Sequence, residues 1–309
     1  MTKTLPLFTL LPPFYDNPPH KDVKWYLKKI EEEFAIEVRK YQYLKWAFDN
    51  DVFIINDEFV IRFPRTLKTR QHLKYEIEFL NFLQSKFDVD FPKYFFRSPD
   101  YSFAVYKLIP GQTLTSTLFK SLNKSNKELV VVQLIDFINK FHEIKPSQLK
   151  KFHPHIKDEY VDIEAKVEKK LTEKLFPKLS KKDVEIIQNF YNEAKTLLVT
   201  APSNCSTHGD LYAYNVFWDK NRLKLGIIDF GDILIGDPAR DFEVFYDYGK
   251  EYAEIAYEKY TGKKDPGFLN RAEIYYKAHG IYTLLSSLLG AQISFDYAYK
   301  FFFKKKFNL

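Results

Sequence analysis

Cysteine, methionine and glycine are scarce in this chain, and long apolar runs are missing. Its 309 residues include one cysteine, one methionine and ten glycines. The single Cys205 excludes an internal disulfide and has no CxxC partner for zinc, which favours a reducing compartment. No run reaches the roughly 18 apolar residues of a membrane-spanning helix, and prolines interrupt the apolar N-terminal stretch, which no small-residue cleavage site follows. We therefore expect a soluble cytoplasmic protein without a membrane partner.

The remaining composition indicates a folded protein with a large core. Hydrophobic residues make up 45% of the chain and aromatic residues 18%, which excludes disorder as a description of the whole. The net charge of +6 is modest and would suit nucleic acid only if it were concentrated in one patch. The basic tail FFFKKKF could contact nucleic acid or a membrane. A docked helix whose lysines reach solvent is the simpler interpretation. We expect a monomer and no nucleic-acid partner.

The pattern of apolar residues divides the chain into two parts. Short strands with Asn/Asp turns, one embedded helix over 67–86 and a helix over 21–34 precede the break at Ile109-Pro110-Gly111. Beyond it the pattern is mostly helical, with one strand pair around Lys220-Asn221; the helices are expected at 127–142, 160–174, 181–198, 239–260, 269–289 and 293–304. The sequence therefore predicts an α+β fold, with an antiparallel sheet and one main helix in a domain over 1–108 and a mostly helical domain over 109–309.

One segment gathers residues that suit metal and phosphate chemistry. Four of the ten glycines fall within 28 residues, together with Asp210, Asn215 and Asp229. Asp210 and Asn215 lie five residues apart on a loop that enters a strand, and Asp229 follows an apolar strand. Carboxylate and carboxamide oxygens suit a hard cation such as Mg²⁺. Each residue alone is better explained as a turn former or helix cap, but the whole set at this spacing is not.

These motifs resemble those of a known family. HGDLYAYN at 208–215 and IIDFGD at 227–232 are similar to the catalytic and metal-binding motifs of protein kinases. Asp237-Pro238 follows within eight residues of Asp229, which leaves little room for a peptide-docking activation segment. The chain is therefore more similar to aminoglycoside phosphotransferases and to related small-molecule kinases. The resemblance implies a two-lobed, protein-kinase-like fold with a nucleotide-binding N-terminal lobe and a catalytic, acceptor-binding C-terminal lobe.

The resemblance also assigns roles to the motif residues. Asp210 matches the catalytic aspartate, which accepts or orients the acceptor hydroxyl, while His208 braces the catalytic loop. Asn215 and Asp229 match the Mg²⁺ ligands, and the phosphate donor is ATP or GTP. Phosphoryl transfer of this kind depends on positioning and charge neutralisation.

The N-terminal part supplies the candidate nucleotide-binding residues. Glu76 lies in the apolar stripe of the helix at 67–86, where a carboxylate is costly unless it is paired. The resemblance provides the partner, Arg62, where protein kinases have lysine; an exposed-helix position for Glu76 remains the alternative. Further candidates are the glycine-free phosphate turn with Asp49 and Asn50, and the backbone from Tyr106 to Leu108, against which the base would lie.

Charge on the acceptor side indicates a cationic small molecule. Residues 207–260 contain eleven acidic and six basic side chains, a balance of −5 in a protein of +6. Asp232, Asp247 and Glu251 are the candidates for ammonium groups, although solvated helix-face acids would explain them equally well. Tyrosines in the same region could instead surround a quaternary ammonium, as in a choline-kinase-like enzyme.

Three functions follow, in order of preference. The first is a Mg²⁺-dependent phosphotransferase acting on a hydroxyl of an aminoglycoside-type antibiotic, which would confer resistance. The second is a metabolic kinase for choline, homoserine or methylthioribose. The third is a nucleotide-binding pseudokinase, motivated by Arg62 and the turn without glycine.

Overall fold

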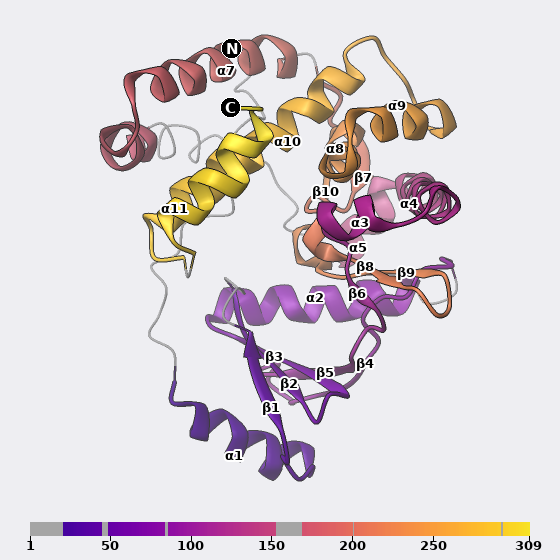
Figure 1. Ribbon diagram of the computed structural model, residues 1–309. Helices are drawn as coiled ribbons and strands as arrows, with labels where there is room; N and C mark the ends of the chain where they lie inside the picture. The colour runs from indigo at the N-terminus through magenta and orange to yellow at the C-terminus, as the bar shows by residue number, and fades with distance from the viewer. Residues whose placement is uncertain (1–20, 45–48, 84–85, 153–168, 200, 292) are drawn as a thin grey trace. The chain divides into compact units, whose positions relative to one another are not determined.

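The computed structural model describes residues 21–44, 49–83, 86–152, 169–199, 201–291 and 293–309 (Figure 1). Two compact units can be distinguished among them. The sheet unit contains residues 21–112 and 217–231, and the helical unit contains residues 113–216 and 232–309. The sheet unit thus takes in a short piece of the segment that we assigned to the C-terminal domain.

The sheet unit is built on an antiparallel five-stranded sheet. Its strands, in the order β1-β2-β3-β5-β4, are β1 (Tyr41–Leu44), β2 (Asn50–Ile55), β3 (Phe59–Pro64), β5 (Ala104–Lys107) and β4 (Tyr94–Arg97). Alternation along β2 and β3 sends Phe53 and Ile61 to one face, against Ile30 of α1 (Val23–Phe34). The opposite face carries Val52, Val60 and Arg62, and α2 (Leu67–Leu83) lies on that side (Figure 1). The expected meander and its helix are confirmed.

The structure also contains a smaller, three-stranded sheet. It has the order β6-β8-β9, with β6 (Gln112–Thr113), β8 (Val216–Asp219) and β9 (Lys224–Ile227). The strand pair expected around Lys220-Asn221 is therefore present. Within the sheet unit, Arg222 bonds to Asp219 and Asp90, which fixes the turn between β8 and β9. This hairpin delivers Asp229, two residues beyond β9.

The helical unit packs around α10 (Phe268–Ser287), which is buried along much of its length. The other elements are α3 (Ser116–Ser121), α4 (Lys124–His142), α5 (Pro146–Phe152), η2 (Leu171–Leu175), η3 (Phe176–Lys178), α7 (Lys181–Leu198), β7 (Cys205–Thr207), η4 (Ala213–Asn215), η5 (Phe230–Asp232, which straddles the boundary of the two units), β10 (Leu234–Gly236), η6 (Pro238–Phe242), α8 (Glu243–Tyr248), α9 (Lys250–Lys259), α11 (Phe295–Ala298) and η7 (Tyr299–Lys304). Strands β7 and β10 pair antiparallel, and the HGD motif directly follows β7. Figure 1 shows α11 and η7 running beside α10.

Most helices expected from periodicity are confirmed, with two corrections. The single helix expected over 239–260 is wrong: Gly249, at φ 147°, ends α8 and starts α9, after the short 3-10 turn η6. The last expected helix is divided into α11 and the π-helical η7. Most of the helix expected at 160–174 lies outside the described residues. No helix in the described ranges is long and apolar enough to cross a membrane.

Candidate active site

The HGD loop begins at the end of β7 with a turn that only glycine suits. Gly209 has φ 84°, and a Cβ placed there would overlap the backbone carbonyl oxygen of Asp232. His208 is fully buried beside it, and Asp210 is half-buried. The sharp turn therefore delivers the Asp210 side chain from the end of a buried strand.

A buried aspartate clamps this turn from behind. The backbone N–H groups of His208 and Gly209 donate to Asp241, at 2.8 and 3.0 Å, and Arg240 Nε donates to the Gly209 carbonyl at 2.5 Å. His142 Nε2 lies 3.0 Å from Asp241 Oδ2. Burial alone would raise the pKa of Asp241, but the His142 bond and the backbone donors outweigh it and hold that pKa below its usual value. An ionised Asp241 thus fixes two amides of the loop.

Asn215 and Asp247 hold the remainder of the loop. Asn215 Nδ2 donates to the Asp210 carbonyl at 2.9 Å and to Asp210 Oδ2 at 3.0 Å. Because the amide nitrogen of Asn215 donates to Asp210, the atom of Asn215 that could bind a cation is its amide oxygen. Asp247 Oδ2 accepts from the Ala213 N–H at 3.0 Å, and Asp247 Oδ1 lies 3.7 Å from Lys306 Nζ. Asp247 therefore supports the loop in addition to any contact with an acceptor.

The other two residues expected to bind the ammonium groups of an acceptor are exposed. Asp232 lies in η5, and its carbonyl oxygen backs Gly209. Glu251 lies in the first turn of α9. The structure thus bonds Asp210 to Asn215 and places Asp247 against the same loop at Ala213, while Asp232 and Glu251 are exposed.

In the sheet unit, Arg62 connects two acidic residues. Arg62 Nη1 donates to both carboxylate oxygens of Glu76, at 2.7 and 2.9 Å, and Arg62 Nη2 lies 3.7 Å from Asp229 Oδ1. The pKa of Glu76 is raised, because the effect of burial exceeds the opposing effect of the Arg62 charge. The ionised form of Glu76 therefore depends on Arg62 as its partner. The pair expected between Glu76 and Arg62 is present, and the exposed-helix alternative for Glu76 is wrong, since its side chain is 1% exposed.

Asp229 is placed in a conformation that few residues other than glycine adopt. Its φ is 68°, and 43% of its side chain is exposed. Such backbone strain is concentrated at functional positions, and here it turns the carboxylate toward solvent and Arg62. Asp229 is therefore an accessible oxygen donor carried by a rigid hairpin.

Asp49 and Asn50 of the expected phosphate turn, and Tyr106 and Leu108 of the segment expected to lie against the base, are buried or half-buried in the sheet unit. Burial raises the pKa of Asp49, with the charge of Asp229 adding to the shift. Asn50 opens β2, and its Oδ1 is buried without a hydrogen-bond partner among the described residues. Tyr106 is buried on β5 against Tyr94, and the Leu108 N–H donates to the Glu58 carbonyl at 2.8 Å.

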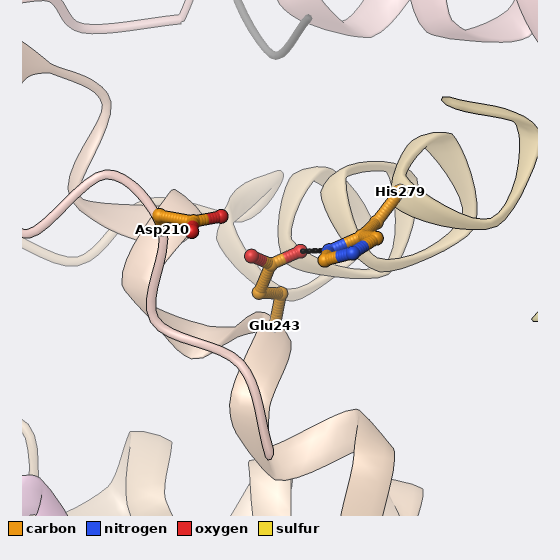
Figure 2. A group of neighbouring side chains, drawn as sticks. All are labelled: Asp210, Glu243 and His279. Atoms are coloured by element: carbon orange, nitrogen blue, oxygen red, sulfur yellow. Dashed lines mark ion pairs between the residues drawn. The ribbon is translucent and has the colours of Figure 1, made fainter. Parts of the chain in front are cut away.

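Two residues near Asp210 were not among the sequence candidates. Glu243 begins α8 and His279 lies in the middle of α10, and Figure 2 shows both converging on Asp210. Burial raises the pKa of Glu243 to about 8 and lowers that of His279 to about 3, so both are neutral near pH 7. A signal existed: Glu243 is a lone carboxylate between Phe242 and Val244, as anomalous as Glu76 in its helix.

The tyrosines considered for a quaternary ammonium lie mostly in the core. Tyr248, Tyr275 and Tyr276 are buried, and Tyr246 donates to the Leu269 carbonyl at 2.9 Å. The ring of Tyr276 already faces a cation, Lys306 Nζ at 4.0 Å from its centroid. These rings therefore serve packing and internal pairing.

Comparison with known proteins gives one family and one fold. The chain superposes on the GDP complex of wild-type aminoglycoside 2'-phosphotransferase-IIIa with a TM-score of 0.76 and 20% identity, over 93% of this chain and 99% of that chain. The streptomycin-ATP-APH(2")-IIa ternary complex matches at 0.64 and 20% identity, covering 94% and 98%. The macrolide 2'-phosphotransferase MphH from Brachybacterium faecium matches at 0.57 and 16%, covering 86% and 93%.

These structural likenesses confirm the fold expected from the sequence. A model of the phosphotransferase enzyme family matches residues 40–273, a range that contains Arg62, Glu76, Asp210, Asn215 and Asp229. That range is more than half of the chain. The chain belongs to the phosphotransferase enzyme family.

Proposed function

We propose that this phosphotransferase moves the γ-phosphate of ATP or GTP to a hydroxyl of an aminoglycoside-type acceptor. The observation that carries the proposal is Asp210, a half-buried carboxylate fixed by Asn215 on a loop that Asp241 clamps. The neighbouring structures include complexes of aminoglycoside phosphotransferases with kanamycin, gentamicin and streptomycin, which supports the acceptor class. The negative balance of residues 207–260 also suits a polycation.

The residues of the chain divide the work of the reaction. Asp210 accepts a hydrogen bond from the acceptor hydroxyl and orients its oxygen for in-line attack, and takes up its proton as the bond to phosphorus forms. Arg62, held by Glu76, supplies a fixed positive charge for the phosphates of the donor. Asp232, Asp247 and Glu251 are proposed to attract the ammonium groups of the acceptor.

Two residues offer the kind of oxygen atom that a magnesium ion binds. The free atom of Asn215 is its amide oxygen, and Asp229 offers an exposed carboxylate, and hard oxygens are the ligands that Mg²⁺ prefers. When bound, the ion would neutralise charge on the transferring phosphate. We propose Asn215 and Asp229 as its ligands.

An acceptor screen tests the proposal. Purified protein with Mg-ATP or Mg-GTP would be offered kanamycin, gentamicin, streptomycin, a macrolide, choline, homoserine and methylthioribose, with release of nucleoside diphosphate as the signal. We expect transfer to an aminoglycoside. Transfer only to choline, homoserine or methylthioribose would overturn the acceptor class, and nucleotide binding without any transfer would indicate a pseudokinase.

The Asp210→Asn variant tests the role of the catalytic loop. Asparagine keeps the shape and the position beside Asn215 but cannot accept the hydroxyl proton, so we expect kcat to fall by about 100-fold to 10,000-fold. Nucleotide affinity, measured by calorimetry, should be unchanged. Wild-type turnover in this variant would remove Asp210 from the mechanism.

A further inference from the structure

Three side chains from separate elements converge beside the catalytic loop. Asp210 comes from the loop after β7, Glu243 from the start of α8, and His279 from α10 (Figure 2). One ligand atom from each lies within 4.8 Å of the other two. In tetrahedral zinc sites, bonds of about 2.0–2.2 Å place the ligand atoms roughly 3.4 Å apart. Displacements of about 1 Å of these side-chain atoms would therefore allow all three to bind one ion.

The donor set differs from that of a magnesium site. Mg²⁺ takes oxygen ligands, whereas two carboxylates and one imidazole suit a transition metal such as Zn²⁺. Three protein ligands leave a fourth position open for water. His279 is neutral near pH 7, so one of its ring nitrogens has a lone pair to offer.

Glu243 provides an independent reason to expect a cation here. Its side chain is 6% exposed, and no hydrogen bond to its carboxyl is found among the described residues. It forms an ion pair with His279, whose Nδ1 lies 3.7 Å from Glu243 Oε2, a distance too long for a hydrogen bond. A buried carboxyl without a donor costs free energy, which a bound cation would recover. The side chain points toward Asp210, into the space between the three residues (Figure 2).

Charged groups of both signs surround these three residues. Four acidic side chains belong to this region, namely Asp210, Glu243, Asp247 and Asp241. The cations that face Glu243 are Arg240, which donates to Gly209, and Lys306, which pairs with Asp247. The edge of the Tyr212 ring packs against His279 at a centroid distance of 4.3 Å, which orients the imidazole.

We propose that Asp210, Glu243 and His279 bind one Zn²⁺ ion, and that this ion inhibits phosphoryl transfer by occupying Asp210. The binding step stands on the geometry alone. The inhibition rests on the proposed function, because it requires that Asp210 receive the acceptor hydroxyl.

Metal binding is tested first and without any acceptor. Metal-free full-length protein would be titrated with Co²⁺, whose visible absorption bands report tetrahedral coordination, and then with competing Zn²⁺. We expect one ion per chain, with affinity at least about 10-fold weaker in His279→Ala and in Glu243→Gln. His72→Ala and Glu273→Gln, which change an imidazole and a carboxylate elsewhere, should keep wild-type affinity. Equal binding by all five proteins, or none by the wild type, would overturn the proposal.

Two further measurements separate folding and activity from binding. His279→Asn retains a polar side chain, and thermal melts without metal would identify any variant that fails to fold. If an acceptor is found, Zn²⁺ should inhibit wild-type transfer at the concentrations that saturate the site, and at least about 10-fold more should be needed in His279→Ala relative to its own zinc-free rate. Absence of transfer to every acceptor would refute the proposed function and leave the binding result intact; unchanged inhibition in His279→Ala would refute the inhibitory role.

Discussion

Gly209 is the residue on which the geometry of the HGD loop depends most directly. It combines a left-handed φ of 84° with contact to the Asp232 carbonyl. We expect Gly209→Ala to lower the free energy of unfolding by about 1–3 kcal/mol and to reduce kcat by about 100-fold, because Asp210 would be displaced. Chemical denaturation and steady-state kinetics measure the two effects.

Gly231 provides the matched control for this substitution. A Cβ there would meet only Asp229 and Glu76 side-chain oxygens at 3.7 and 3.9 Å, which are ordinary contacts, and Gly231 has no positive φ. Gly231→Ala should therefore change both quantities much less than Gly209→Ala. Similar losses in the two variants would show that the turn at Gly209 has no special requirement for glycine.

Residues that form a local motif could be predicted from the sequence, whereas residues brought together only by packing could not. Asp210 and Asn215 lie five residues apart, and the structure bonds them to each other. Glu76 was found because a carboxylate in an apolar stripe needs a partner. Glu243 gave the same kind of signal, but nothing in the sequence connects it with His279 on another helix.

At the scale of elements, Asp183 fastens α7 to the C-terminal helical turn η7. Its carboxylate accepts from Lys304 and Tyr299, each at 2.7 Å, and from Ser180, which caps α7. Burial alone would raise the pKa of Asp183, but these hydrogen bonds hold it below its ordinary value. The basic tail, expected to be a docked helix, is thus tied down by the ion pair between Lys304 and Asp183.

The substitution Asp183→Asn removes this charge with little change in shape. Because the folded pKa is lowered, the stabilisation is present above the ordinary pKa of aspartate, about 4, and is lost as the pH falls through the folded value. We expect a loss of about 1–2 kcal/mol near pH 7, and a smaller difference from wild type below about pH 4. Urea unfolding at both pH values measures it. Asp136→Asn, which breaks an exposed pair with Lys140, is the control and should have almost no effect.

Periodicity predicted the long elements and missed the short ones for physical reasons. A helix such as α7 shows enough turns to reveal its apolar face, while β7 and β10 have three residues each and no detectable alternation. The break at Gly249 was missed because a single glycine within a helical pattern is usually tolerated. The left-handed backbone of Gly249 is needed because α8 and α9 pack as two separate helices, and this packing is not visible in the sequence.

At the scale of the whole molecule, charge is divided unevenly along the chain. The protein carries +6, yet residues 207–260 carry −5. Asp210, Asp247 and Glu251 belong to this acidic segment, and Asp232 contributes an exposed carboxylate. If these acids attract a polycationic acceptor, the attraction acts over distances at which salt screens it.

Raising the salt concentration should therefore weaken acceptor capture without slowing the chemical step. With saturating nucleotide, we expect kcat/KM for an aminoglycoside to fall several-fold between about 0.05 and 0.3 M NaCl, because the Debye length shortens from roughly 14 to 6 Å, while kcat stays constant. Glu251→Gln should lower kcat/KM at low salt and show a shallower salt dependence, whereas Glu273→Gln, outside the segment, should match wild type. A salt-independent kcat/KM would mean that the acidic segment serves the fold rather than the acceptor.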